Sequence, residues 1–182
     1  MSKLFFNTIN PVKVREIKEI FEQIDTDIAF LDHNITEILS ADLEKVIKAK
    51  AADAYKAAKV PVIVEHGALE IEFLNNYPSA LSKPMWDMLE GKICQLIPAS
   101  DQRKAAARSA VCFCDGKSYI VCFGRTEGTI ALERKGTGGF QWDPIFIPVG
   151  STKTYAEMEQ TEKLTFSQAR KAYEELIKKL FK

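Results

Sequence analysis

Residues 62–71 read VIVEHGALEI, a β-branched run that ends in a glutamate and a histidine before apolar and polar residues alternate again. Short runs rich in valine and isoleucine predict buried β-strands. We therefore expect one strand over residues 62–65 and another over residues 68–73, separated at Gly67. Pro61 divides these strands from an alanine-rich stretch with helical spacing. A strand that ends on Glu65 and His66 presents two groups capable of acid–base chemistry.

The composition is that of an ordinary globular protein. Among 182 residues, 25 are Lys or Arg and 25 are Asp or Glu, so the net charge gives no reason to expect nucleic acid or a membrane surface as a partner. No apolar run approaches the roughly 20 residues of a membrane span, and the N-terminus lacks the apolar core of a signal peptide. The four cysteines are expected to be reduced core thiols. We predict a cytoplasmic chain with one domain, residues 1–182.

Strands and helices alternate along the chain. Asn10 and Pro11 predict a helix start, because asparagine is a good N-cap and proline suits the first helical position. Ser40 or Asp42 is expected to cap a long helix to about residue 59, and Ser167 the last helix. The other predicted elements are strands at 3–7, 28–31 and 145–147, a first helix with Val14, Ile17, Phe21 and Ile24 on one stripe, a helix from Pro84, a helical turn at 154–158, and a hairpin of 105–114 and 118–125 turning at Asp115-Gly116. The pattern indicates a compact α/β domain.

The segment from residue 6 to residue 13 combines a strand, a turn and a helix start. Backbone N–H groups left free there, with Thr8, Asn10 and Lys13, could hold a phosphate. The alternative is a capped helix with no ligand.

Two glutamates are candidates for a metal site. Glu44 and Glu65 could supply the carboxylates for Mg²⁺, which takes one or two protein carboxylates and completes its shell with water and phosphates. Alternatively, Glu44 complements the helix dipole and pairs with Lys48.

Residues 136–144, GTGGFQWDP, form a glycine-rich loop. If this loop is extended, Phe140 and Trp142 lie on one side and could flank a purine, with Asp143 accepting a hydrogen bond from the ring. The alternative is a tight loop that closes over the core. His66 likewise has two readings, a catalyst or a hydrogen-bonded residue at the end of a strand.

Taken together, these segments resemble the inosine triphosphate pyrophosphatase family nearly end to end. The similar stretches are TINPVK at 8–13, VIVE at 62–65, YPSALSK at 77–83, GGFQWDP at 138–144 and TYAEMEQTEK at 154–163. The resemblance places Lys83 at a phosphate, Lys163 in the base pocket and Glu44 at the family's metal-binding glutamate. It implies an elongated α/β domain in which a long mixed β-sheet is flanked by helices and a nucleotide lies in a cleft between two lobes. It also implies a homodimer that uses Mg²⁺ to hydrolyse ITP, dITP and XTP to the monophosphate and pyrophosphate.

The chain departs from the family pattern at residues that matter for chemistry. His66 stands where the family has its general-base aspartate, and Ile9 where the first motif has glycine. The family's base-contacting histidine and arginine correspond to Gln168 and Ala169, and Arg170 lies one place further on, about 100° round a helix. An imidazole is a poor ligand for Mg²⁺, and losing a general base costs about 10²–10⁴-fold in rate.

These departures favour a receptor that binds dITP or ITP with little or no hydrolysis. Such a sensor could act in antiviral defence by switching on a partner, for example a sirtuin-like NAD-hydrolysing effector. The alternative is an active pyrophosphatase in which His66, or water held by Glu65, is the base. The sequence therefore leaves open whether the chain is an enzyme.

Overall fold

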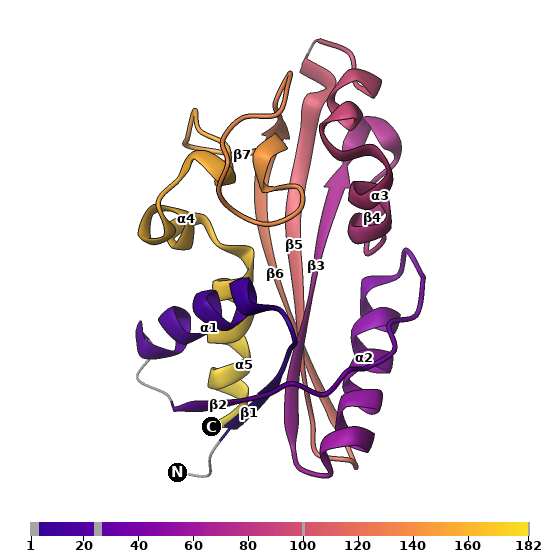
Figure 1. Ribbon diagram of the computed structural model, residues 1–182, viewed down its shortest axis with the longest axis vertical. Helices are drawn as coiled ribbons and strands as arrows, with labels where there is room; N and C mark the ends of the chain where they lie inside the picture. The colour runs from indigo at the N-terminus through magenta and orange to yellow at the C-terminus, as the bar shows by residue number, and fades with distance from the viewer. Residues whose placement is uncertain (1–3, 24–26, 100, 182) are drawn as a thin grey trace.

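The computed structural model describes residues 4–23, 27–99 and 101–181. It shows a mixed α/β fold in which a seven-stranded sheet is flanked by helices, as the sequence predicts (Figure 1). Lys3 and Ile24, placed by the sequence in the first strand and the first helix, lie outside the described residues.

The elements follow one another in the predicted alternation. The strands are β1 (Leu4–Asn7), β2 (Ile28–Leu31), β3 (Val62–Ile71), β4 (Tyr77–Ser79), β5 (Lys104–Cys114), β6 (Tyr119–Ile130) and β7 (Phe146–Pro148). The α-helices are α1 (Pro11–Gln23), α2 (Leu43–Ala58), α3 (Ser82–Leu89), α4 (Gln160–Phe166) and α5 (Gln168–Leu180). Short 3₁₀ turns lie at η1 (Glu72–Leu74), η2 (Glu90–Leu96), η3 (Asp101–Arg103), η4 (Asp143–Ile145) and η5 (Tyr155–Glu157).

The three longest strands, β3, β5 and β6, form the centre of the sheet. The strand order is β2-β1-β3-β5-β6-β7, with β4 paired to β3; β1 is parallel to β2 and to β3, and the other pairings are antiparallel. The predicted break after Glu65 is wrong. Gly67 pairs with Ser109 in β5, so β3 continues unbroken to Ile71, where η1 begins.

Helices cover the two faces of the sheet in different places. In Figure 1, α1 and α5 lie together beside the lower half of the sheet, α2 lies on its other side, and α3 lies above α2. Three apolar clusters correspond to these layers. One packs β1, α1 and α5 around Phe6 and Tyr173, one packs α2 against Val64 and Ala110, and one fills the upper part around Phe146. All four cysteines are buried with free thiols.

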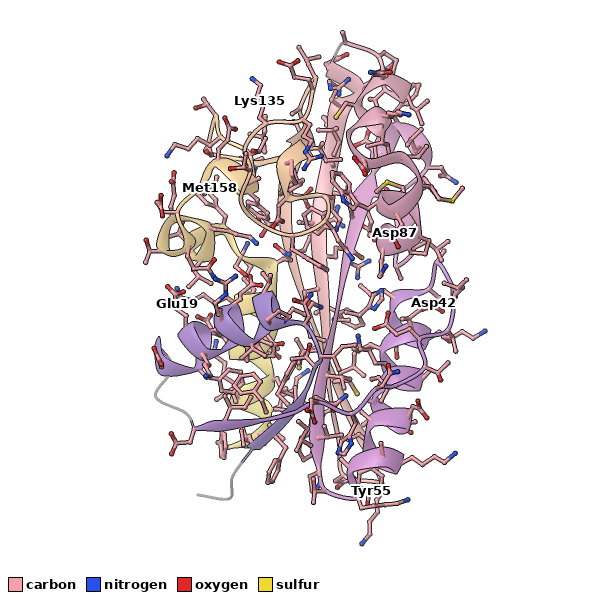
Figure 2. All side chains as sticks on the ribbon, viewed as in Figure 1. Glu19, Asp42, Tyr55, Asp87, Lys135 and Met158 are labelled. Carbon is pink, nitrogen blue, oxygen red and sulfur yellow. The ribbon has the colours of Figure 1, made fainter. Side chains whose placement is uncertain are left out.

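Side chains cap the N-termini of three helices as the sequence predicts. Asn10 Oδ1 accepts from Val12 N (2.9 Å) at the start of α1, and Ser167 Oγ accepts from Arg170 N (3.1 Å) at the start of α5. Of the two candidate caps of α2, Asp42 is the one used, since it accepts from Lys45 N (3.1 Å). Figure 2 shows Asp42 and Tyr55 at opposite ends of this helix. Helix α3 begins at Ser82, two residues earlier than predicted.

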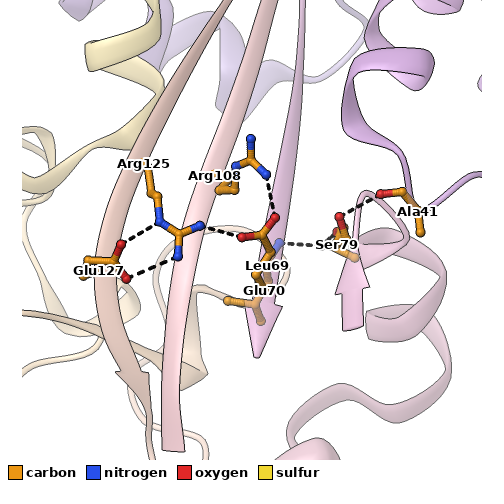
Figure 3. A network of polar contacts seen from close by, with 8 residues as sticks. Ala41, Leu69, Glu70, Ser79, Arg108, Arg125 and Glu127 are labelled. Carbon is orange, nitrogen blue, oxygen red and sulfur yellow. Dashed lines mark hydrogen bonds and ion pairs between the residues drawn. The ribbon is translucent and has the colours of Figure 1, made fainter. Parts of the chain in front are cut away.

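Ionic contacts bridge the strands on the upper part of the sheet. Glu70 on β3 pairs with Arg108 on β5 and with Arg125 on β6, each at 2.6 Å, and Arg125 also pairs with Glu127 (Figure 3). Among the described residues, no helix is long and apolar enough to cross a membrane.

Candidate functional site

A pocket of about 470 Å³ opens where the lower and upper halves of the molecule meet. Its wall is formed by the β1–α1 turn and the first half of α1, the segment 33–37, one residue each of α2 and α3, the middle of β3, the loop 140–143, the middle of α4 and the start of α5. The lining includes eleven of the twelve residues that the sequence singles out, namely Thr8, Asn10, Lys13, Glu65, His66, Lys83, Phe140, Trp142, Asp143, Lys163 and Gln168. Glu44 does not line it.

Glu65 lies at the floor of this pocket and is fully engaged. Its Oε2 pairs with Lys13 Nζ at 2.6 Å, and its Oε1 accepts from Ser109 Oγ at 2.7 Å. Burial by itself would raise the pKa of Glu65, but the Lys13 ammonium and the two hydrogen bonds outweigh burial and hold the pKa below its usual value. Glu65 is therefore an anion whose two oxygens already have partners.

His66 has one nitrogen occupied and one free. Its Nε2 lies 2.9 Å from the carbonyl oxygen of Ala80. A carbonyl can only accept, so Nε2 carries the proton. Burial, followed by the charge of Lys50, lowers the pKa of His66, so the imidazole is neutral at pH 7 and Nδ1 carries a lone pair. Nδ1 lies 4.0 Å from Oε2 of Glu37.

Glu37, Lys50 and Glu16 complete the charged part of the pocket, and the sequence analysis missed all three. Glu37 pairs with Lys50 through Oε1. Glu16 has no hydrogen bond or ion pair among the described residues, and burial raises its pKa. Two of these residues had a signal in the sequence. Glu16 follows Lys13 by three residues and so shares its helix face, and Lys50 follows Leu43 by seven on the buried stripe.

The other end of the pocket joins an acid, a lysine and aromatic side chains. Lys163 Nζ lies 2.9 Å from Asp143 Oδ2, which also accepts from Phe140 N at 2.6 Å. Gln141 has a φ of 49°, so the loop is turned and not extended, and the predicted side-by-side aromatic pair does not form. Trp142 is 5% exposed and packs on Phe146, whereas Phe140 is 37% exposed at the pocket.

Gln168 lies beside Tyr155 at the same end. Its Oε1 is 3.2 Å from the Tyr155 hydroxyl, which is also 3.2 Å from the carbonyl oxygen of Phe166. Arg170 pairs with Glu174 at 2.8 Å and does not line the pocket, in agreement with the rotation expected from its position.

Two expectations about charged and polar groups are not met. Glu44 is 53% exposed and pairs with Lys48, which is the alternative that the sequence left open, because the residue points away from the buried stripe of α2. The backbone N–H groups at the start of α1 are not free. Asn10 Oδ1 accepts from Val12 N and Lys13 N, and Thr8 Oγ1 accepts from Asn10 N. Any phosphate would therefore meet side chains there first.

Comparison with known proteins identifies the family. A model of the Ham1 family matches residues 4–179. The chain belongs to the Ham1 family. It is 38% identical over 173 residues to the dITP/XTP pyrophosphatase of Pyrococcus horikoshii, covering 93% of this chain and 92% of that protein. The dITP/XTP pyrophosphatase of Thermococcus kodakarensis is 33% identical, with coverages of 95% and 94%. A solved Ham1 structure from Coxiella burnetii has a TM-score of 0.82 at 26% identity, covering 99% of this chain and 98% of that one.

The prediction of a sensor that does not hydrolyse its nucleotide is contradicted by these relatives. They match nearly the whole chain and are named as pyrophosphatases. The prediction treated the exchange of aspartate for His66 as the loss of the reactive group. In the structure, the imidazole is neutral and keeps a free lone pair inside the pocket. His66 can therefore still accept a proton inside the pocket.

Ham1 pyrophosphatases generally depend on a divalent metal. Among the described residues, no group of three or more His, Cys, Asp or Glu side chains is gathered to bind a metal. An ion would therefore be held by one or two protein groups together with phosphates, which is a usual mode for hard divalent cations. Glu37 pairs with Lys50 through Oε1 and keeps Oε2 for such an ion, whereas both oxygens of Glu65 already have partners.

Proposed function

We propose that this Ham1 protein hydrolyses non-standard purine nucleoside triphosphates of the dITP and XTP class to the monophosphate and pyrophosphate. The observation that carries the proposal is the composition of the pocket. Three lysines, Lys13, Lys50 and Lys83, line one part of it, and the Lys163–Asp143 pair lines another with the ring of Phe140. The carboxylate of Glu65 and the neutral imidazole of His66 line the same pocket. The names of full-length relatives support the same reaction.

The lysine end suits the triphosphate. Lys13 and Lys50 are held by Glu65 and Glu37, and Lys83 lies at the pocket edge on α3. Thr8 and Asn10 add polar side chains. Phosphate oxygens can share these ammonium groups with the carboxylates, because an ammonium has three donors.

The opposite end suits the purine. Phe140 offers a partly exposed ring, and the buried Trp142 also lines the pocket. Asp143, Lys163 and Gln168 present acceptor and donor groups to the edge of the base. These contacts would distinguish 6-oxo from 6-amino purines by leaving a buried polar group unpaired with the wrong base.

The α-phosphate of a nucleotide bound in this way lies near Glu65 and His66. Water oxygen attacks the α-phosphorus and gives up a proton, the bond to the bridging oxygen of the α–β anhydride breaks, and pyrophosphate leaves with the electron pair of that bond. His66 is the proposed catalytic residue at this point, because its lone pair can take a proton or hold a cation. A divalent cation, Mg²⁺ by expectation, would be held by Glu37 together with the phosphates and would neutralise charge on the leaving group.

Other features stay predictions. A homodimer, an effector enzyme as partner, a cytoplasmic location and a role in antiviral defence were expected from the sequence, and the pocket bears on none of them.

The test is pyrophosphate release from dITP, XTP and dATP by purified protein with Mg²⁺. We expect dITP and XTP to be converted with kcat/KM at least ~10²-fold above dATP, since a site built to hydrogen-bond its substrate rejects analogues strongly. Lys163→Met should raise KM for dITP. Absence of pyrophosphate with all three nucleotides would refute the proposal.

A further inference from the structure

The pair formed by His66 and Glu37 has an unusual feature. Nδ1 of His66 and Oε2 of Glu37 face each other at 4.0 Å, and because Nε2 donates to the carbonyl oxygen of Ala80, the neutral imidazole presents Nδ1 as an acceptor. Two facing lone pairs repel unless something electropositive lies between them. Lys50 does not fill this role, because it binds the other carboxylate oxygen, Oε1.

The imidazole is also oriented as ligating histidines are. A histidine that binds a metal through one nitrogen usually donates its other N–H to a carbonyl or carboxylate, which fixes the tautomer and the ring plane. His66 makes this contact with the carbonyl oxygen of Ala80, in the turn that precedes α3. The side chain is 12% exposed, so its free nitrogen is held inside the pocket.

We infer that His66 Nδ1 and Glu37 Oε2 are the protein ligands of the divalent cation, and that this mixed nitrogen and oxygen pair selects Mn²⁺ over Mg²⁺. Mg²⁺ strongly prefers oxygen ligands, whereas first-row transition ions accept imidazole nitrogen readily. The inference rests on the proposed function, since the remaining ligands are phosphate oxygens and water.

Two lysines near the pair oppose binding of a cation. Lys50 and Lys13 are the cations that face the pair, and both are compensated, Lys50 by Glu37 and Lys13 by Glu65. Bound nucleotide adds several negative charges at the same place. The cation is therefore expected to bind strongly only together with the triphosphate.

The inference is tested with the whole protein and α,β-methylene dITP, which cannot be hydrolysed. Mn²⁺ binding is followed by electron paramagnetic resonance, and a directly coordinated imidazole is detected by ¹⁴N modulation of the electron spin echo. We expect ¹⁴N modulation in the wild type and a large excess of Mg²⁺ to be required for displacement. His66→Asp should abolish the modulation and lower the Mg²⁺ excess by at least ~10-fold, the scale of losses seen when a metal site is altered.

Two further variants make the result decisive. Glu37→Gln should weaken Mn²⁺ binding at least ~10-fold while the ¹⁴N signal persists at saturation, so the test survives if His66→Asp does not fold. Glu44→Gln, at an exposed position outside the pocket, should change neither quantity. Bound Mn²⁺ without ¹⁴N modulation in the wild type would overturn the inference. Pyrophosphate release from dITP with Mg²⁺, measured separately, would leave the proposed function standing in that case.

Discussion

Replacing Lys163 by methionine should destabilise the protein far more than an ordinary lysine substitution. The pair between Lys163 and Asp143 is short, at 2.9 Å, and its side chains are only 11% and 6% exposed. Removing one partner of a buried pair leaves an uncompensated charge and costs about 3–5 kcal/mol. Because Asp143 keeps its hydrogen bond from Phe140 N, we expect the lower end, about 3 kcal/mol. For a chain of this size that corresponds to a fall in Tm of roughly 6–12 °C.

The assay is urea unfolding of Lys163→Met, Asp143→Asn and the double variant. A matched control exists on the surface. Lys153 pairs with Glu162 at 2.8 Å, but the side chains are 51% and 36% exposed. Lys153→Met should therefore cost less than about 1 kcal/mol. The double variant should recover about 1–2 kcal/mol of the loss, since the two residues are coupled. Equal costs for Lys163→Met and Lys153→Met would refute the reasoning.

Three other outcomes follow from single sites. Arg103 is 7% exposed and donates to carbonyl oxygens of Ile97, Ile130 and neighbouring residues. In urea unfolding, Arg103→Met should therefore lower the free energy of unfolding by more than about 3 kcal/mol. Arg134 is exposed, so Arg134→Met should lower it by less than about 1 kcal/mol. The pKa of Glu16 is raised in the folded state, so above pH 4.5 the folded state keeps a proton that the unfolded state has lost, and stability falls as pH rises above 4.5. Glu16→Gln should therefore stabilise the protein at pH 7 but not at pH 4, and equal effects at both pH values would contradict this. A Cβ at Gly124 would lie 1.7 Å from the carbonyl oxygen of Gln168. Gly124→Ala should therefore lower the free energy of unfolding by more than about 2 kcal/mol and raise KM for dITP, because the start of α5 is displaced. Unchanged stability would show that α5 can shift freely.

Local signals in the sequence predicted the elements well. Asn10, Asp42 and Ser167 cap their helices through side-chain contacts with residues two or three places away, so their roles can be read from a few letters. The break predicted at Gly67 failed because the pairing partner, Ser109, lies 42 residues away in β5 and keeps the strand continuous. No local pattern contains that pairing.

The motifs in the sequence point to many of the residues that line the pocket, but they include Glu44, which lies outside it, and miss Glu37, which lines it. Glu44 was taken as a metal ligand, although it stands next to Leu43 and is therefore turned about 100° from the buried stripe of α2. Glu37 was missed because it lies in the irregular segment before α2, where no periodicity shows which side chains turn inward. Its place beside His66 depends on contacts between distant segments, such as that of Asn7 with His33.

The most direct test of the proposed reaction is hydrolysis of dITP in ¹⁸O-labelled water, followed by ³¹P NMR. Attack of water on the α-phosphorus predicts dIMP that carries ¹⁸O, together with unlabelled pyrophosphate. Label in the pyrophosphate would place the attack on the β-phosphorus and contradict the arrangement of Glu65 and His66 proposed for the α-phosphate. Bound dITP that stays intact over many hours would contradict pyrophosphatase activity altogether.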